Sequence, residues 1–293
     1  MEMPSIEGLR QQAWQAHHGG DLAQAEQLYR HLLGLSGALP DRRDAINLGA
    51  LLRALGRLKD AETHYSHYIE QLPADTTLRL NGVNALLDAK RCDQALSWIE
   101  QGLAREPDHA ELLQARAKAL SGLGDKGNAR QLLEVLVQRH PNDKGLWLDL
   151  GQLVHSLQDP QAALDAFEQV RRLDPADLRA VANRVTVLQE MGRFAEAEAT
   201  IAELPPDQAN DPLVRGAQAG LYIQQQRFED AVRVLAALSQ QDPGNPVHWL
   251  NQAACLRSLK HMMACTQVLK QGLRRHPGHA DLQQALAQSM AEM

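Results

Sequence analysis

One small residue recurs along this chain at an almost constant interval. After a first interval of 36 residues every step is 34, and the series runs through Ala25, Ala61, Ala95, Ala129, Ala163, Ala197, Ala231 and Cys265. Prolines keep the same period at Pro73, Pro107, Pro141, Pro175, Pro243 and Pro277. Two interleaved series with a common period of this length are typical of tandem structural repeats, in which each unit packs against its neighbours. The sequence therefore predicts a chain built from copies of one short unit.

The central unit of the series shows what each copy folds into. Apolar residues three or four apart mark one face of each of two helices, with Trp147, Leu150 and Val154 in the first and Ala163, Phe167 and Val170 in the second. Gly151 and Ala163 are small enough to let the two helices approach closely. Asp159 is a suitable N-cap for the second helix, Pro160 suits its first position, and Pro175 ends it. The unit is predicted to be a helical hairpin.

The order of these residues, W-x2-L-G followed by A-x3-F and then P, resembles the tetratricopeptide repeat (TPR). The resemblance implies an all-α protein, a right-handed TPR superhelix (α-solenoid) of eight helix-turn-helix repeats plus a C-terminal capping helix. Residues 1–293 are expected to form a single TPR solenoid domain. The expected repeats cover about 6–41, 42–75, 76–109, 110–143, 144–177, 178–211, 212–245 and 246–279, and the cap helix covers 280–293.

Three places depart from the regular unit. The loop at residues 34–37 carries the two extra residues of the first interval. The turn through Lys90 and Arg91 is expected to be one residue longer than its counterparts. Pro205 and Pro206 are expected to end the second helix of the sixth repeat about one turn early, because proline cannot continue the hydrogen-bond ladder.

Charge and apolar patterning argue against several functions. The 36 acidic and 30 basic residues are interspersed and give a net charge of −6, which does not favour nucleic-acid binding. The first ten residues do not resemble a secretory signal, and no apolar run approaches the roughly 18 residues of a membrane span. We therefore expect a soluble, cytoplasmic protein without membrane insertion. The three cysteines lack metal or disulfide spacing and are expected to be reduced, mostly buried thiols.

Residues that match chemical motifs are better explained by the helical repeat. Residues 122–127 match G-x-G-x-x-G but fall on a turn after a helix, whereas the dinucleotide fingerprint follows a strand. His64 and His67, like His261 and Cys265, have the spacing of paired metal ligands, but neither pair has a third ligand nearby in sequence. We expect the first pair on the outer face and Cys265 in the core. The sequence therefore predicts no enzyme, no cofactor and no metal.

Asparagine recurs at the sixth position of several repeats although it is a poor helix former. The residues are Asn47, Asn81, Asn183 and Asn251. In TPR proteins this position faces the concave groove, and the row resembles the asparagine ladder of the TPR region of O-linked N-acetylglucosamine transferase. A carboxamide at this position can pair with the backbone of an extended peptide. It can equally bond to the adjacent helix, and the sequence leaves both alternatives open.

The other groove positions supply further candidate peptide-binding residues. They are Asn84, Arg43, Arg53, Lys118, Gln152, His155, Arg179 and Arg257, with Asp88, Glu111, Asp149 and Glu190 between them. This mixture suits a polypeptide that carries charges of its own. Trp14, at the ninth position of the first repeat, either stacks on a ligand side chain or packs the first hairpin.

Three functions are compatible with this pattern. The leading prediction is a non-catalytic protein–protein interaction scaffold that binds an extended peptide or partner protein in the concave groove. The alternative is the substrate-recruiting TPR region of a larger glycosyltransferase, because the late repeats resemble those of O-linked N-acetylglucosamine transferase and SPINDLY-type proteins. An RNA-binding helical repeat is disfavoured by the negative net charge and the 4% content of aromatic residues.

Overall fold

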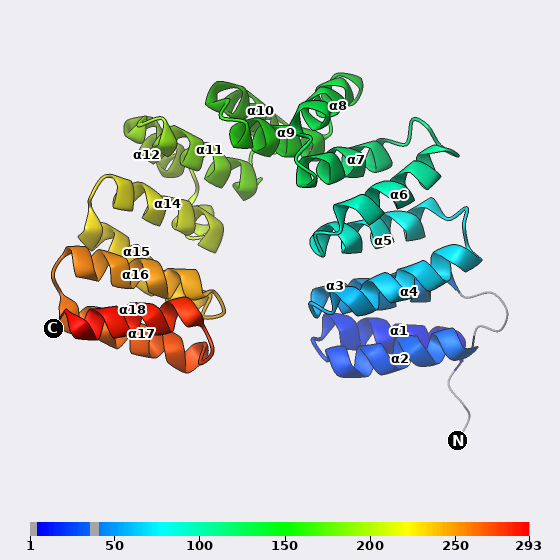
Figure 1. The fold of residues 1–293 in the computed structure, drawn as a ribbon, viewed down its shortest axis with the longest axis horizontal. Coiled ribbons are helices and arrows are strands. Elements are labelled where there is room, and N and C mark those ends of the chain that lie inside the picture. The colour runs from blue at the N-terminus through cyan, green and yellow to red at the C-terminus, as the bar shows by residue number, and fades with distance from the viewer. Residues whose placement is uncertain (1–4, 36–40, 293) are drawn as a thin grey trace. The chain divides into compact units, whose positions relative to one another are not determined.

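The computed structural model describes residues 5–35 and 41–292, and these form eighteen helices and no strand (Figure 1). Sixteen of the helices pair into hairpins. The first helices of the hairpins, here called A helices, are α1 (Ile6–His18), α3 (Arg42–Ala54), α5 (Thr76–Asp88), α7 (Ala110–Gly122), α9 (Lys144–Ser156), α11 (Leu178–Glu190), α14 (Pro212–Gln224) and α16 (Pro246–Ser258). The second or B helices are α2 (Leu22–Leu35), α4 (Leu58–Gln71), α6 (Cys92–Leu103), α8 (Lys126–Arg139), α10 (Pro160–Leu173), α12 (Phe194–Ala202), α15 (Phe228–Gln241) and α17 (Met262–Arg275).

The A helices start at regular intervals because their N-caps do. From α3 to α16, the side chain of the preceding residue accepts a hydrogen bond from a backbone N–H of the first turn. These N-caps follow one another at steps of 34 residues and are Asp41, Asp75, His109, Asp143, Asp177, Asp211 and Asn245. An N-cap satisfies one of the orphan donors of a helix start, so each repeat carries its own start signal.

The turn inside each hairpin contains one residue with left-handed backbone geometry. Half of these positions are glycine, with φ between 71° and 88°, and the others are Lys90, Gln158, Gln226 and Lys260, with φ between 59° and 61°. The turn at Lys90 therefore has the same form as the turn at Gly56, 34 residues earlier, and the expectation of an extra residue there is wrong. A lysine adopts the left-handed conformation that glycine adopts elsewhere, at a cost of the order of 1 kcal/mol.

At the contact between the two helices of a hairpin, the sizes of the facing A-helix and B-helix residues vary together from repeat to repeat. The ring of Tyr65 lies against Gly49 and the ring of Phe167 lies against Gly151, so that a methyl group on either glycine would stand within 2.6 Å of ring atoms. The equivalent buried pairs elsewhere are Ala13 with Tyr29, Val83 with Ile99, Ala117 with Leu133, Val185 with Ile201, Ala219 with Leu235 and Ala253 with Leu269. An aromatic residue on the B helix is accompanied by glycine or alanine on the A helix, as close packing requires. The predicted close approach at Gly151 and Ala163, which is fully buried, is confirmed.

The chain divides into two compact units, residues 1–139 and 140–293, which we describe separately. Within each unit the B helices pack on the A helix that follows in the same unit, as α4 does on α5 and α15 does on α16. In the first unit the A helices also contact one another, α3 with α5 and α5 with α7. Apolar surface left by one hairpin is therefore covered by the next, which is how tandem repeats obtain their stability. The single-domain assignment for 1–293 stays a prediction.

The sixth repeat departs from this plan in the predicted place. Its B helix, α12, has 9 residues where the other B helices have 12 to 14, and a four-residue helix, α13 (Pro206–Ala209), follows it. The early end before Pro205 and Pro206 is thus confirmed. Because α12 is short, α14 packs more extensively on the A helix α11 than on α12. The remaining helix, α18 (Ala280–Ala291), buries Leu282 against α16 and α17 and is the expected cap.

Two other expectations concern buried side chains. All three cysteines, Cys92, Cys255 and Cys265, are buried and free, as predicted. The placement of His64 on the outer face is wrong: its ring Nε2 lies 2.6 Å from the carbonyl oxygen of Ala45, between α3 and α4. Burial lowers the pKa of this imidazole, although the contact with the carbonyl opposes the shift. Part of the expected loop at residues 34–37 lies outside the described residues.

Candidate functional site

Unit 1 carries a pocket of about 320 Å³ between the A helices α1 and α3. Two of the candidate residues, Arg43 and Asn47, line it together with Trp14, and Tyr29 of α2 lies at its base. Within the described residues the carboxamide of Asn47 has no hydrogen-bond partner. The pocket therefore offers an amide and an aromatic ring on adjoining helices.

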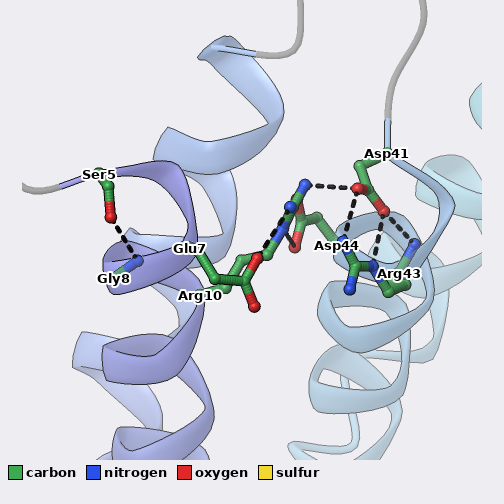
Figure 2. Close-up of polar contacts among 7 residues, drawn as sticks. All are labelled: Ser5, Glu7, Gly8, Arg10, Asp41, Arg43 and Asp44. Atoms are coloured by element: carbon green, nitrogen blue, oxygen red, sulfur yellow. Dashed lines mark hydrogen bonds and ion pairs between the residues drawn. The ribbon is translucent and has the colours of Figure 1, made fainter.

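Ion pairs hold the two walls of this pocket together (Figure 2). Asp44, with 1% of its side chain exposed, accepts hydrogen bonds from Nε of Arg10 at 3.1 and 3.2 Å and from Nη2 at 3.0 Å. Nη2 of Arg10 also donates to Asp41. A buried carboxylate is costly without such a partner, so Arg10 is needed to join α1 to α3 and its charge is already balanced.

Arg43 is the more accessible cation of this pocket. Its side chain is 61% exposed and pairs with Asp41 at 3.3 Å. Burial opposes ionisation of Asp41, but its hydrogen bonds with Arg43 and the nearby charge of Arg10 keep the pKa of this carboxyl below its usual value. An exposed pair of this kind contributes little to stability, so Arg43 can exchange Asp41 for a ligand group at small cost.

Trp14 is 55% exposed, yet its ring has a fixed neighbour. It stacks on His18, with the ring centroids 4.1 Å apart and the planes inclined by 27°, and Nδ1 of His18 lies 2.9 Å from the carbonyl oxygen of Trp14. One face of the Trp14 ring therefore packs within the first hairpin, as one of the two alternatives expects. Its exposed surface lines the pocket.

Unit 2 carries a larger pocket of about 480 Å³ over the A helices α11, α14 and α16. The candidate residue Asn183 lines it together with Thr186 and Gln189, all from α11. The facing helix α14 contributes Gly216, which leaves its backbone uncovered, and Gly220, over which the side chain of Gln189 lies. Sequence reasoning missed this second group because it considered one repeat position at a time. The signal was the run of small residues at the groove positions of the seventh repeat.

The other two asparagines of the row lie outside both pockets. Asn81 donates through Nδ2 to the carbonyl oxygen of Thr77 in its own helix, at 2.9 Å. Asn251 is exposed on α16, as is Asn84 on α5. In the part of the chain that the structure describes, none of the four row amides bonds to a neighbouring helix. The geometry thus departs from the alternative in which these amides serve inter-helix packing.

Two of the basic candidates are engaged in equivalent inter-repeat pairs. Arg53 donates to Oδ2 of Asp88 at 2.6 Å, and Nε2 of His155 lies 2.6 Å from Oε2 of Glu190. In both pairs the twelfth position of one repeat meets the thirteenth position of the next. These residues connect successive A helices, so any ligand that uses them has to compete with the existing partner.

Arg179 supports the start of α11. It donates to Asp177 at 2.7 Å, and Nζ of Lys144 lies 3.2 Å from the same carboxylate, of which 3% is exposed. The hydrogen bond with Arg179 lowers the pKa of Asp177 to about 2, with Lys144 adding to the shift and burial opposing it. The remaining candidates, Lys118, Gln152 and Arg257, are exposed on α7, α9 and α16.

Neither a metal centre nor a membrane span is found in the described ranges. No group of three or more His, Cys, Asp or Glu side chains is placed to hold an ion within residues 5–35 and 41–292. Among the same residues, none of the helices combines the length and the apolar character needed to cross a bilayer. Cytoplasmic localisation stays a prediction.

Comparison with known proteins identifies the family. Residues 52–119, 154–221 and 222–289 match one family model described as tetratricopeptide repeat, and residues 115–177 match a second model with the same description. The hairpin geometry and the period agree with this match. The chain belongs to the tetratricopeptide repeat family.

The curated relatives share only part of their length with this chain, whereas a solved structure matches it almost throughout. A TPR repeat-containing protein of Pseudomonas aeruginosa is 25% identical over 201 residues, which are 66% of this chain and 34% of that protein. Human protein O-mannosyl-transferase TMTC1 is 24% identical over 172 residues, 56% of this chain and 19% of the transferase. The crystal structure of a tetratricopeptide repeat protein from Parabacteroides merdae has a TM-score of 0.60 and 16% identity over 97% of this chain and 98% of that one. The chain thus spans about a third or less of these curated relatives, and the solved structure supports the fold.

Proposed function

We propose that this chain is a non-catalytic scaffold that binds an extended peptide or a partner protein on the surface formed by its A helices. TPR arrays provide extended binding surfaces by stacking equivalent helices, which supports a general role in protein interaction. The proposal assigns the binding surface to the A helices and the recognition of peptide backbone to the asparagine row.

The state of the row amides carries this proposal. Asparagine lowers helix stability relative to alanine, so its recurrence on four A helices has a cost. Asn47, Asn183 and Asn251 have no hydrogen-bond partner among the described residues, and Asn81 bonds only to its own helix. Amides that cost helix stability without joining the helices are well suited to hydrogen bonding with a ligand backbone, which offers both donors and acceptors.

The test replaces Asn47, Asn81, Asn183 and Asn251 together by alanine. We expect the variant to lose binding of peptides selected on the wild-type chain, and to keep or slightly raise its Tm, because alanine is the better helix former. Thermal unfolding followed by circular dichroism and fluorescence anisotropy of the labelled peptides supply the two readouts. A matched control replaces four exposed polar residues of B helices by alanine and should leave binding unchanged.

The reverse pattern contradicts the proposal. If the amides serve packing, removing them costs roughly 1 kcal/mol each and lowers the Tm, while peptide binding persists. That pair of results would return the asparagine row to a structural role.

A second candidate function is the substrate-recruiting TPR region of a larger glycosyltransferase. The similarity to a human protein O-mannosyl-transferase, of which this chain matches 19%, favours it. An immunoblot of the native source with an antibody against this chain distinguishes the two. A recruiting region predicts a species much heavier than the 32.4 kDa of the chain that has glycosyltransferase activity after immunoprecipitation, whereas a scaffold predicts a species without that activity.

A further inference from the structure

The pocket of unit 2 has a floor that no other repeat provides. At the fifth, sixth and ninth positions of the seventh repeat, α14 carries Gly216, Ala217 and Gly220. The second repeat has Ile46, Asn47 and Ala50 at these positions, and the fifth has Leu148, Asp149 and Gln152. A Cβ added at Gly216 would meet nothing within 4 Å, so the space above this residue is open. The hollow therefore belongs to this repeat and is not a general property of the array.

The polar walls of the hollow carry neutral groups that can both donate and accept. Asn183 and Gln189 come from α11 and line the pocket beside Gly216 and Gly220. The amide of Gln189 lies over α14, 3.4 Å from the position of a Cβ on Gly220. Neither amide has a hydrogen-bond partner among the described residues, so both are available to the backbone of a ligand.

The charge around the hollow is low for a chain in which 23% of residues are charged. Among the described residues that line it, none is lysine or arginine. The single carboxylate is Asp242, whose Oδ2 lies 3.5 Å from Nε2 of His248, another lining residue. An anionic ligand group would find no lysine or arginine among these lining residues, and a cationic group would have to compete with His248 for Asp242, so the pocket disfavours charged groups.

Apolar surface completes the pocket. Leu213, 46% exposed, stands at its edge on α14, and Pro212 and Ala182 line it as well. The second position of the next repeat is Val247, 50% exposed, where the second and sixth repeats carry Arg43 and Arg179. The seventh and eighth repeats therefore expose apolar side chains at a position that is basic in the second and sixth repeats. Burial of an apolar ligand side chain against this surface is favourable.

We propose that this pocket binds an uncharged segment of a partner polypeptide, with one large apolar side chain of the segment seated over Gly216. The amides of Asn183 and Gln189 bond to the backbone of that segment. The inference rests on the proposed function, because it takes the ligand of the A-helix surface to be a polypeptide. Beyond that function, it specifies that the bound segment is uncharged and that the pocket at Gly216 selects its apolar side chain.

A pocket-filling substitution tests this inference. A phage-displayed library of random 12-residue peptides is selected on the full-length chain, and the affinity of each enriched peptide is measured for the wild type, Gly216→Ala and Gly216→Leu. Because a side chain at Gly216 has open space and glycine is a poor helix residue, both variants should retain the wild-type Tm or exceed it. Gly127→Leu is the matched control, since this helical glycine of α8 also faces open space and lies outside the pocket.

The expected result is graded by size. Enriched peptides share a neutral stretch with one leucine, methionine or aromatic residue, and Gly216→Leu weakens them about tenfold or more, Gly216→Ala less and Gly127→Leu not at all. Replacement of the shared apolar residue by Glu or Lys in the peptide causes a similar loss.

Other outcomes separate this inference from the function on which it rests. Peptides that lose binding when Asn47 and Asn81 become alanine, but bind Gly216→Leu as well as the wild type, overturn the inference and leave the proposed function standing. Enriched peptides that require a charged residue in the Gly216-sensitive segment overturn it too. If selection enriches no peptide, both the inference and the proposed function fail.

Discussion

The substitution Gly151→Ala tests whether the size of this A-helix residue limits how closely the two helices of its hairpin approach each other. The added Cβ would lie 2.5 Å from Cε1, 2.8 Å from Cδ1 and 2.9 Å from Cζ of Phe167, a residue with no exposed surface. Because the ring is enclosed, either it leaves its rotamer or α9 and α10 move apart. Overpacking of this kind lowers the free energy of unfolding by about 1–3 kcal/mol, and the better helix propensity of alanine offsets about 0.5–1 kcal/mol of this loss. We expect a net loss of roughly 1 kcal/mol.

The control and the rescue come from the chain itself. Gly216→Ala introduces the same methyl group into a helix with nothing within 4 Å, and should stabilise the protein by about 0.5–1 kcal/mol. Three repeats pair alanine with leucine at the positions of Gly151 and Phe167. In the Phe167→Leu background, Gly151→Ala should therefore become neutral or stabilising. Urea unfolding followed by circular dichroism gives the four free energies of this double-mutant cycle, and we expect a coupling of about 1 kcal/mol or more.

Additive effects of the substitutions at positions 151 and 167 on the free energy of unfolding would contradict this packing cost. Equal effects of Gly151→Ala with phenylalanine and with leucine at position 167 would mean that the ring does not limit the approach of the two helices. The same effect for Gly151→Ala and Gly216→Ala would exclude a packing cost at Gly151 altogether.

Three further predictions concern stability. Ala163→Leu should cost about 1–3 kcal/mol by overpacking a fully buried site, whereas thermal melts of Ala199→Leu, at an exposed position of α12, should match the wild type. Gln158→Gly should raise the Tm, since glycine relieves the strain at φ 61°, and Gln158→Val should lower it. Asp177→Asn keeps an N-cap but removes the charge. Because the folded pKa of Asp177 is depressed to about 2, its contribution is present above pH 4 and is lost as pH falls through 2. The variant should thus be less stable than the wild type by about 1–2 kcal/mol at pH 6 after discounting for solvent screening, and the gap should close near pH 2 in urea titrations.

Most of the fold could be predicted from the 34-residue period of the sequence. The A helices begin at Arg42, Thr76 and Ala110, which are the residues where the 34-residue series places the repeat starts, and the remaining A helices follow the same rule. This works because each repeat contains its own caps, small contact residues and terminators, all local signals. The error at Lys90 has an equally local cause. Lys90 adopts the left-handed conformation that glycine adopts in the equivalent turn at Gly56, so the turn keeps its usual length.

The site could be predicted less well because side-chain partners depend on neighbouring repeats. The sequence shows that Arg53 and His155 face the surface of the A helices, but not that Asp88 and Glu190 of the following repeats bind them. It shows an asparagine at position 81 but cannot tell that its amide turns back to Thr77. The hollow at Gly216 lies on one repeat, and the repeats on both sides supply its walls. Comparing the same position across all repeats therefore does not reveal it.

The most direct test of the central claim is a map of the ligand-binding surface by photo-crosslinking. p-Benzoylphenylalanine is placed at Asn183 on α11 or Asn251 on α16, and, for comparison, at the exposed Gln240 on the B helix α15. Each protein is irradiated with a peptide selected on the wild-type chain, and the covalent adducts are measured by mass spectrometry. Binding on the A-helix surface predicts adducts from the α11 and α16 positions and none from α15. Adducts from Gln240, with none from the two A helices, would contradict the account.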